Sequence, residues 1–205
     1  MKSLYLRSGL ALLCGAILSA CGGSDGSLQL SGSISGLTKP GLVLQNEGNG
    51  DTVTVDITTN ASSFQFGKLL EVDDYFKVTI KNSPVGATCV PSANEGKANV
   101  YNAYYIVITC TADPRWLGGT VSNLKGEGLI MSNGSDTIAV PAGAVSFTFP
   151  RQIGDGSSYG IRVFQQPAGQ QCTLPTTGTG TGIGTIGSSN LTDAAVVTCV
   201  DTPST

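Results

Sequence analysis

The stretch FQFGKLLEVDDYFKVTIKNSPVGATC at residues 64–89 aligns without a gap with FTFPRQIGDGSSYGIRVFQQPAGQQC at residues 147–172. Each stretch begins with Phe-x-Phe and ends with Pro-x-Gly-x-x-Cys, and apolar residues alternate with polar ones in the middle of both. Such alternation is typical of a β-strand that buries one face. The two stretches therefore predict the same strand-rich unit twice in one chain.

The correspondence extends beyond both stretches. Upstream, GLV at 41–43 matches GLI at 128–130, and downstream VITC at 107–110 matches VVTC at 196–199. Gly, Asn and Asp separate short runs of strand-forming residues at a spacing that favours a sandwich or barrel. We expect about seven strands in each unit. In the first unit they should lie near residues 29–36, 41–46, 52–57, 63–66, 75–82, 87–91 and 104–111.

These patterns predict an all-β chain of two tandem β-sandwich modules, at residues 29–112 and 116–200. Between them, Asp113-Pro114 is expected in a linker turn, and residues 201–205 form a tail. Trp116 lies at the join in the sequence, so we expect its ring to pack where the two modules meet.

The composition restricts the chemistry available to the chain. It contains no histidine, which excludes Ser-His-Asp and Cys-His catalysis and His-based zinc sites. The formal net charge is −3 and no basic cluster occurs, which argues against nucleic-acid binding. We therefore predict no enzymatic activity, no metal and no cofactor.

The first residues have the features of an export signal. Lys2 and Arg7 are followed by an apolar stretch at 9–17 that is too short to span a bilayer. We therefore predict a signal peptide at residues 1–20. A plain secretory signal that is cleaved near Ala20 is the alternative to the lipoprotein signal considered next.

The sequence LSAC at residues 18–21 resembles the bacterial lipobox. The resemblance implies a lipoprotein in which the thiol of Cys21 carries the lipid (a palmitate-type acyl anchor), followed by a flexible tether at 21–28. By the same resemblance, Gly22 in place of Asp implies the outer membrane of a Gram-negative bacterium, on the periplasmic face or the cell surface. The membrane would then be a partner through the anchor.

The order of the internal motifs also resembles a known family. Gly-Leu-Val, Phe-x-Phe and Pro-x-Gly-x-x-Cys follow one another as in the immunoglobulin-like repeats of many bacterial lipoproteins and surface proteins. A more remote resemblance is to prealbumin-like sandwiches of adhesin and carboxypeptidase-regulatory modules. The resemblance spans residues 29–200. It implies a non-catalytic, lipid-anchored envelope protein that serves as a structural spacer or an adhesion module.

Four cysteines remain in the two units after the signal and the lipid site are set aside. They allow three pairings, and the one within each unit is favoured because both units carry their pair at matching landmarks. We therefore expect the disulfides Cys89–Cys110 and Cys172–Cys199. Each would contribute roughly 3–4 kcal/mol by closing a short loop in an oxidising compartment.

Aromatic residues suggest one alternative function. Tyr101, Tyr104, Tyr105 and Trp116 are candidate ligand contacts, because exposed rings can form a platform for sugar or protein. On this hypothesis the chain is a binding module for a glycan or an envelope protein. A contiguous exposed patch would favour it, and scattered buried rings would favour the spacer.

Acidic residues suggest a second alternative. Glu71, Asp73 and Asp74 form the densest acidic group, and a carboxylate-dependent hydrolase would need two such acids facing one cleft. The matching segment of the second unit, Gly154-Asp155-Gly156-Ser157, keeps one acid and predicts a turn. We expect solvated turns at both places.

Three loops match known ligand motifs formally. The oxygen-rich segments at 46–51 and 133–136 could hold Ca²⁺, but Asn-Gly and Gly-Asp are also ordinary hairpin residues, which is the interpretation we favour. Residues 182–187 match the Gly-x-Gly-x-x-Gly pattern without the helix that a dinucleotide site needs. We expect an enlarged, mobile loop at residues 176–189.

Overall fold

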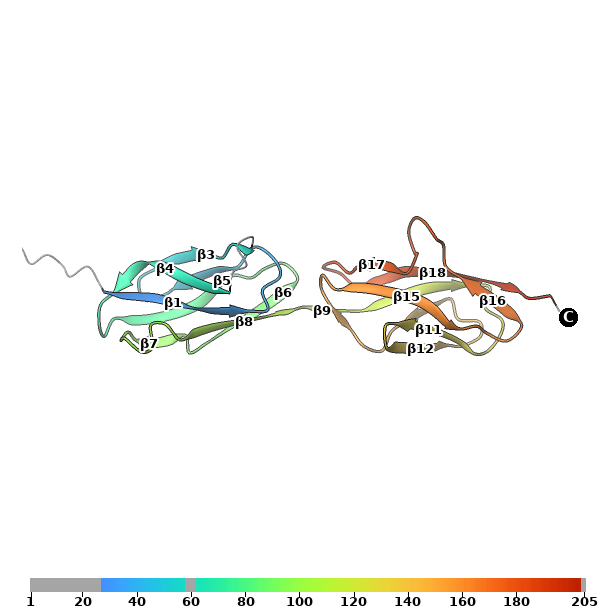
Figure 1. The fold of residues 1–205 in the computed structure, drawn as a ribbon, viewed down its shortest axis with the longest axis horizontal. Helices are drawn as coiled ribbons and strands as arrows, with labels where there is room; N and C mark the ends of the chain where they lie inside the picture. Colours follow the sequence, from blue (N-terminus) through green and yellow to red (C-terminus); the bar gives the residue numbers. More distant parts are fainter. Residues whose placement is uncertain (1–26, 58–61, 204–205) are drawn as a thin grey trace, which may run out of the picture.

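The structure is a computed structural model that describes residues 27–57 and 62–203. Within these residues the chain is all-β and forms two β-sandwich modules, which lie end to end with a short strand between them (Figure 1). The predicted fold class is therefore confirmed. The signal peptide, Cys21 and most of the tether lie outside the described residues.

The first module is built from two four-stranded sheets, ordered β4-β1-β8-β6 and β3-β2-β5-β7. Its strands are β1 (Leu28–Ser35), β2 (Val43–Asn46), β3 (Thr52–Thr54), β4 (Ser63–Leu70), β5 (Tyr75–Asn82), β6 (Ala87–Ser92), β7 (Glu95–Lys97) and β8 (Ile106–Ala112). The first and last strands, β1 and β8, are parallel neighbours. The other paired strands are antiparallel.

The second module has sheets of corresponding strand order, β13-β10-β18-β16 and β12-β11-β15-β17. Its strands are β10 (Leu117–Ser122), β11 (Leu129–Asn133), β12 (Asp136–Val140), β13 (Ser146–Thr148), β15 (Ser158–Gln165), β16 (Gln170–Thr173), β17 (Ile183–Thr185) and β18 (Leu191–Asp201). Here β10 and β18 are the parallel pair. The linker strand β9 (Pro114–Arg115) pairs with β14 (Ile153–Gly154).

The Phe-x-Phe motif explains how each sandwich closes over its first strand. Phe64 lies opposite Gly32 in the β1–β4 pair, and a Cβ on that glycine would lie 2.7 Å from the Phe64 ring. Phe147 lies opposite Gly119 in the same way, with 2.8 Å between such a Cβ and the ring. An aromatic ring thus covers a strand glycine in both modules, an arrangement that fixes strand register.

Each sandwich has its own core. The first is centred on Leu30, Phe66 and Ile106, and the second on Leu117 and Phe149, all of them fully or almost fully buried. The two phenylalanines of each motif pack edge to face, with ring centroids 5.8 Å apart in the first module and 5.7 Å in the second. This geometry is favourable for aromatic pairs.

Both predicted disulfides are confirmed. Cys89 lies directly opposite Cys110 on β6 and β8, and Cys172 lies directly opposite Cys199 on β16 and β18. All four cysteines are buried. Each bond therefore ties the last strand of its module to a neighbouring strand of the same sheet.

The structure departs from the predicted strands in a few places. β1 starts at Leu28, which we expected in the tether, because its side chain is already part of the core. β7 was not expected, since its sequence Glu-Gly-Lys has no strand-forming residue. Within the loop predicted at 176–189, Ile183–Thr185 form β17, because they pair with β15. No α-helix occurs in residues 27–57 and 62–203.

Candidate functional site

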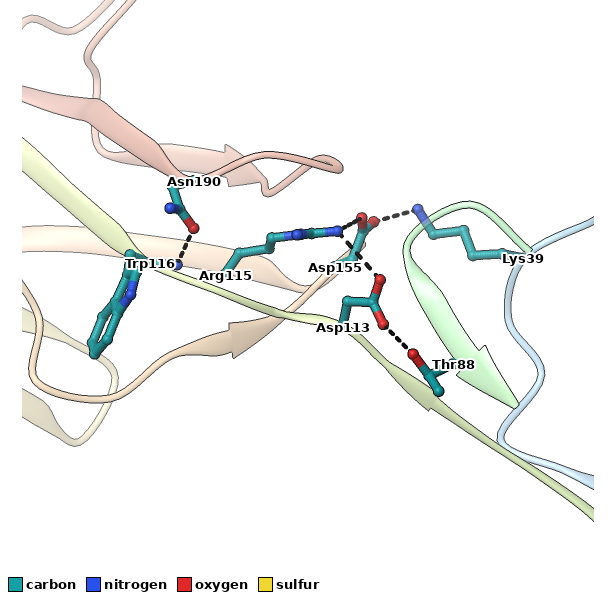
Figure 2. A network of polar contacts seen from close by, with 7 residues as sticks. All are labelled: Lys39, Thr88, Asp113, Arg115, Trp116, Asp155 and Asn190. Atoms are coloured by element: carbon teal, nitrogen blue, oxygen red, sulfur yellow. Dashed lines mark hydrogen bonds and ion pairs between the residues drawn. The ribbon is translucent and has the colours of Figure 1, made fainter. Parts of the chain in front are cut away.

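A network of charged residues around one buried carboxylate, that of Asp155, lies where the two modules meet (Figure 2). The pairing of β9 with β14 brings Asp155, the residue after β14, next to the linker. There the backbone N–H of Asp155 donates to the carbonyl of Asp113 at 2.9 Å. Gly156 follows with φ of 82°, a left-handed conformation that glycine adopts without strain. The predicted turn at this segment is thus present and aims Asp155 at the first module.

The carboxylate of Asp155 reaches across the joint. Its side chain is 0% exposed, and Oδ1 accepts a hydrogen bond of 2.6 Å from Nζ of Lys39, in the β1–β2 connection of the first module. Oδ2 lies 3.6 Å from Nη2 of Arg115 in the linker. The carboxylate also packs on Gly86, where a Cβ would lie 2.1 Å from Oδ2. A side chain at residue 86 would therefore displace the carboxylate.

Asp113 completes the network from the linker side. Its Oδ2 lies 3.4 Å from Nη2 of Arg115, and its Oδ1 accepts a hydrogen bond of 2.8 Å from the hydroxyl of Thr88 in β6. Its backbone N–H donates to the carbonyl of Gly86 at 2.9 Å. Two carboxylates and two cations thus balance one another around the buried Asp155 carboxylate, while the other three side chains stay partly exposed.

The network stabilises Asp155 in its charged form. The hydrogen bond from Lys39 lowers the pKa of Asp155 below its usual value, and the positive charges of Lys39 and Arg115 act in the same direction against the effect of burial. A carboxylate that stays ionised in this way is a poor general acid at neutral pH. An ionised Asp155 suits a salt-bridge contact between the two modules, and we call the group Lys39, Asp113, Arg115 and Asp155 the ionic joint.

The structure separates the four aromatic residues predicted as ligand contacts. Tyr101, Tyr104 and Tyr105 are exposed in the connection between β7 and β8, at the end of the first module that faces away from β9 (Figure 1). Trp116 belongs to the start of the second module. The tyrosines therefore form one exposed group, and the tryptophan lies apart from it.

Trp116 does not occupy the place predicted for it. Its ring is 40% exposed and points away from the ionic joint, which Arg115, the preceding residue, enters instead (Figure 2). Side chains of consecutive residues in an extended strand point in opposite directions, so when Arg115 faces the joint Trp116 faces away from it. The Trp116 ring lines a shallow groove of about 400 Å³ whose other lining residues are Thr148, Phe149, Pro150, Asn190 and Thr192.

The acidic group predicted as a hydrolase candidate lies in a turn. Glu71, Asp73 and Asp74 are all exposed, and the backbone N–H of Glu71 donates to Oδ2 of Asp74 at 2.8 Å. Asp73 has φ of 70°, as a turn residue can. The three acids thus stand exposed in one turn, whereas hydrolysis needs two acids held across a cleft.

The two oxygen-rich loops are hairpin turns, and the asparagine side chains in them accept hydrogen bonds from backbone N–H groups. Oδ1 of Asn46 accepts hydrogen bonds from the backbone N–H groups of Gly48 and Lys77, both at 3.1 Å. Oδ1 of Asn133 accepts from Gly160, at 2.9 Å, across the corresponding strands. The sequence predicted the two hairpin turns but not this role of the asparagines. No group of acidic or cysteine side chains suited to a metal occurs in the described residues.

The Gly-x-Gly-x-x-Gly segment is part of a sheet edge. The carbonyl of Gly182 accepts from the backbone N–H of Ile161 at 2.6 Å, and its own N–H donates to Ala194 at 2.9 Å. The segment just before it, together with Tyr159 and Asp193, lines a small cavity of about 260 Å³. These backbone groups are already bonded within the protein, so they do not form a phosphate cradle.

The sequence matches no protein-family model and no curated protein. Among the described residues, no helix has the length and apolar character needed to cross a membrane.

Proposed function

We propose that this chain is a non-catalytic, lipid-anchored spacer of the Gram-negative outer membrane, built of two immunoglobulin-like repeats. Cys21 would carry the lipid, and the two sandwiches would hold whatever lies beyond them at a set distance from the membrane. The motif order and the equal strand order of the two modules support the assignment to such repeats. An alternative within this class is an adhesion module on the same scaffold.

The ionic joint is the observation that carries the proposal. Two domains linked by a few residues move independently unless their contact restrains them. Here the buried carboxylate of Asp155 bonds to Lys39 across the joint, and Asp113 bonds to the first module through Thr88. The Lys39–Asp155 contact joins one module to the other, and the Asp113–Thr88 contact holds the linker on the first module, so together they oppose bending. A spacer needs this property, and a pair of independent binding modules does not.

The first experiment tests the anchor. The full chain and its Cys21→Ser variant are expressed in a Gram-negative host, and their membrane fractions and N-terminal masses are compared. We expect the unaltered chain in the outer membrane with a diacylated N-terminal cysteine, and the variant in the soluble fraction. An unmodified Cys21 in the membrane fraction would contradict the proposal.

The second experiment tests the spacer. Spin labels on one exposed residue of each module, Val90 and Phe164, report the distance distribution between the modules in the Cys21→Ser chain. We expect one narrow distribution, which broadens when a Gly-Ser pair is inserted after Ala112. A broad distribution without the insertion would show that the modules move freely and would refute the spacer.

A binding module for a glycan or an envelope protein is a second candidate, because the rings of Tyr101, Tyr104 and Tyr105 are exposed together. The groove beside Trp116 offers a separate platform with hydroxyl and amide neighbours. A glycan array and a pull-down from envelope extract with the Cys21→Ser chain test this candidate. Specific capture that is lost on Tyr101→Ser or Trp116→Ala would support it.

A further inference from the structure

The three exposed tyrosines lie at the end of the first module where the chain enters it. β8 runs parallel to β1, with Ile106 opposite Gly32, so the residues before Ile106 lie beside those before Gly32. The backbone N–H of Ser31 accordingly donates to the carbonyl of Ala103 at 2.9 Å. Figure 1 shows this end, with β7, opposite the joint. The tyrosines are therefore close to the start of β1.

A second turn belongs to the same end. Leu28 pairs with Leu70, so the turn after β4 lies beside the start of β1. Its backbone is hydrogen-bonded to the connection between β7 and β8, which carries the tyrosines. The N–H of Asp73 donates to the carbonyl of Ala98 at 2.9 Å, and the N–H of Ala98 donates to the carbonyl of Asp74 at 2.8 Å. We call residues 71–75 and 98–105 together the entry tip.

The entry tip exposes large apolar side chains on an ordered backbone. Tyr101 is 75% exposed and Tyr105 69%, and Val72, Tyr75, Val100 and Tyr104 are exposed as well. Oδ1 of Asn99 accepts from the N–H groups of Tyr101 and Asn102, at 2.9 and 3.1 Å. Oδ1 of Asn102 accepts in turn from the N–H of Asn99 at 2.9 Å. The rings are thus presented by a bonded loop, which lowers the entropy lost on binding.

The position of the entry tip suggests what it contacts. Residues 22–27 lie between the proposed lipid on Cys21 and the first strand, and six extended residues span at most about 20 Å. The tip would therefore always be near the bilayer surface, where even a weak contact is favoured by its high effective concentration. Tyrosine is suited to this environment, because its ring is apolar and its hydroxyl remains at the headgroup level.

The charge of the entry tip selects the kind of lipid. Glu71, Asp73 and Asp74 are exposed in it, and the exposed Lys97, which pairs with Tyr75, lies at its border, so that three acids face one lysine. An anionic surface would repel these carboxylates, whereas zwitterionic headgroups present an ammonium group to them. We propose that the entry tip docks on the zwitterionic headgroup region of the membrane that holds Cys21. This inference rests on the proposed lipid anchor and adds a second, protein-mediated contact to it.

The test uses the lipidated full chain in vesicles. Trp116→Phe removes the natural tryptophan, and Tyr101→Trp then places a single reporter in the entry tip. A matched reporter, Phe164→Trp in the same background, lies on an exposed position of β15 in the second module. Zwitterionic phosphatidylethanolamine–phosphatidylcholine vesicles with brominated acyl chains quench tryptophan that enters the interface. Thermal melts verify that both reporter chains are folded like the unaltered one.

We expect the emission of the reporter at residue 101 to fall by about half and to shift to the blue, with no change at residue 164. Replacing a third of the lipid by phosphatidylglycerol should weaken the quenching at low salt, and added salt should restore it. Stronger quenching with anionic lipid would contradict the role given to the carboxylates.

The outcomes separate the two proposals. If the chain floats with the vesicles through its lipid but residue 101 is not quenched, the docking proposal is wrong and the anchor stands. If Cys21 is unmodified and the chain does not float, both are wrong. If soluble glycan strands shift the emission of the Cys21→Ser chain while lipid does not quench residue 101, the entry tip is a sugar site instead.

Discussion

Removing the disulfide of the second module should lower its free energy of unfolding by about 3.6 kcal/mol. The change is Cys172→Ala with Cys199→Ala, which leaves the strand pairing between β16 and β18 in place. The sequence separation of 27 residues sets the magnitude through the entropy that the closed loop removes from the unfolded chain. The corresponding first-module pair spans 21 residues, for which the same relation gives about 3.3 kcal/mol.

Urea unfolding followed by the fluorescence of Trp116 measures this loss, because the residue lies at the start of the second module. With a slope of about 1.5 kcal/mol per molar urea, the midpoint should fall by about 2.4 M. The matched control, Cys89→Ala with Cys110→Ala, should move the tyrosine signal of the first module and leave the Trp116 midpoint within about 0.5 M.

A loss below about 1 kcal/mol in the second module would contradict this expectation, since the loop-closure relation could not then describe the Cys172–Cys199 bond. If both double variants lowered the urea midpoint of Trp116 fluorescence equally, the two modules would not be unfolding independently. This would mean that the two cores unfold as one unit through the ionic joint, rather than each within its own sandwich.

Three further predictions concern glycine packing and the joint. Gly119→Ala should lower the free energy of unfolding of the second module by about 2 kcal/mol in urea, because its Cβ would lie 2.3 Å from the carbonyl oxygen of Ala195. The control Gly160→Ala, which has open space around it, should lower it far less. Asp155→Asn should broaden the distance distribution between spin labels in the two modules, and Asp201→Asn, remote from the joint, should not; equal distributions would contradict the ionic joint. Because Lys39 lowers the pKa of Asp155, the stabilisation from this pair is complete above about pH 4, the ordinary carboxylate value, and is lost as the pH falls through the lower folded-state pKa. Small-angle scattering between pH 7 and acid should therefore show bending only at the acid end, and bending that begins near neutral pH would contradict this sign.

The features that could be predicted from sequence are those that recur at a fixed spacing. The aligned Phe-x-Phe and Pro-x-Gly-x-x-Cys motifs indicated two equal units. Cys110 and Cys199 occupy matching positions in these units, which led to the correct disulfides. Both kinds of signal are local to one module. The alternation of Phe76, Val78 and Ile80 likewise located β5 at its observed bounds.

The ionic joint could not be predicted in the same way. Lys39 and Asp155 are 116 residues apart, and each occurs in a turn-forming segment that looks ordinary by itself. Trp116 was the evident candidate for the contact between modules, because it is large and lies near the boundary. Its neighbour Arg115 enters the ionic joint instead, because side chains of an extended strand point alternately to opposite sides. Which of the two residues faces the joint is set by the pairing of β9 with β14.

The parallel pairing of each module's first and last strands has a mechanical consequence. A pull on the two ends of the chain enters the first module at the start of β1 and leaves it at the end of β8. It enters the second module at the start of β10 and leaves at the end of β18. Because these strands are hydrogen-bonded side by side and run in the same direction, the load shears their bonds all together instead of unzipping them one at a time. Both sandwiches should consequently resist stretching along the chain far better than a pull that peels one edge strand away.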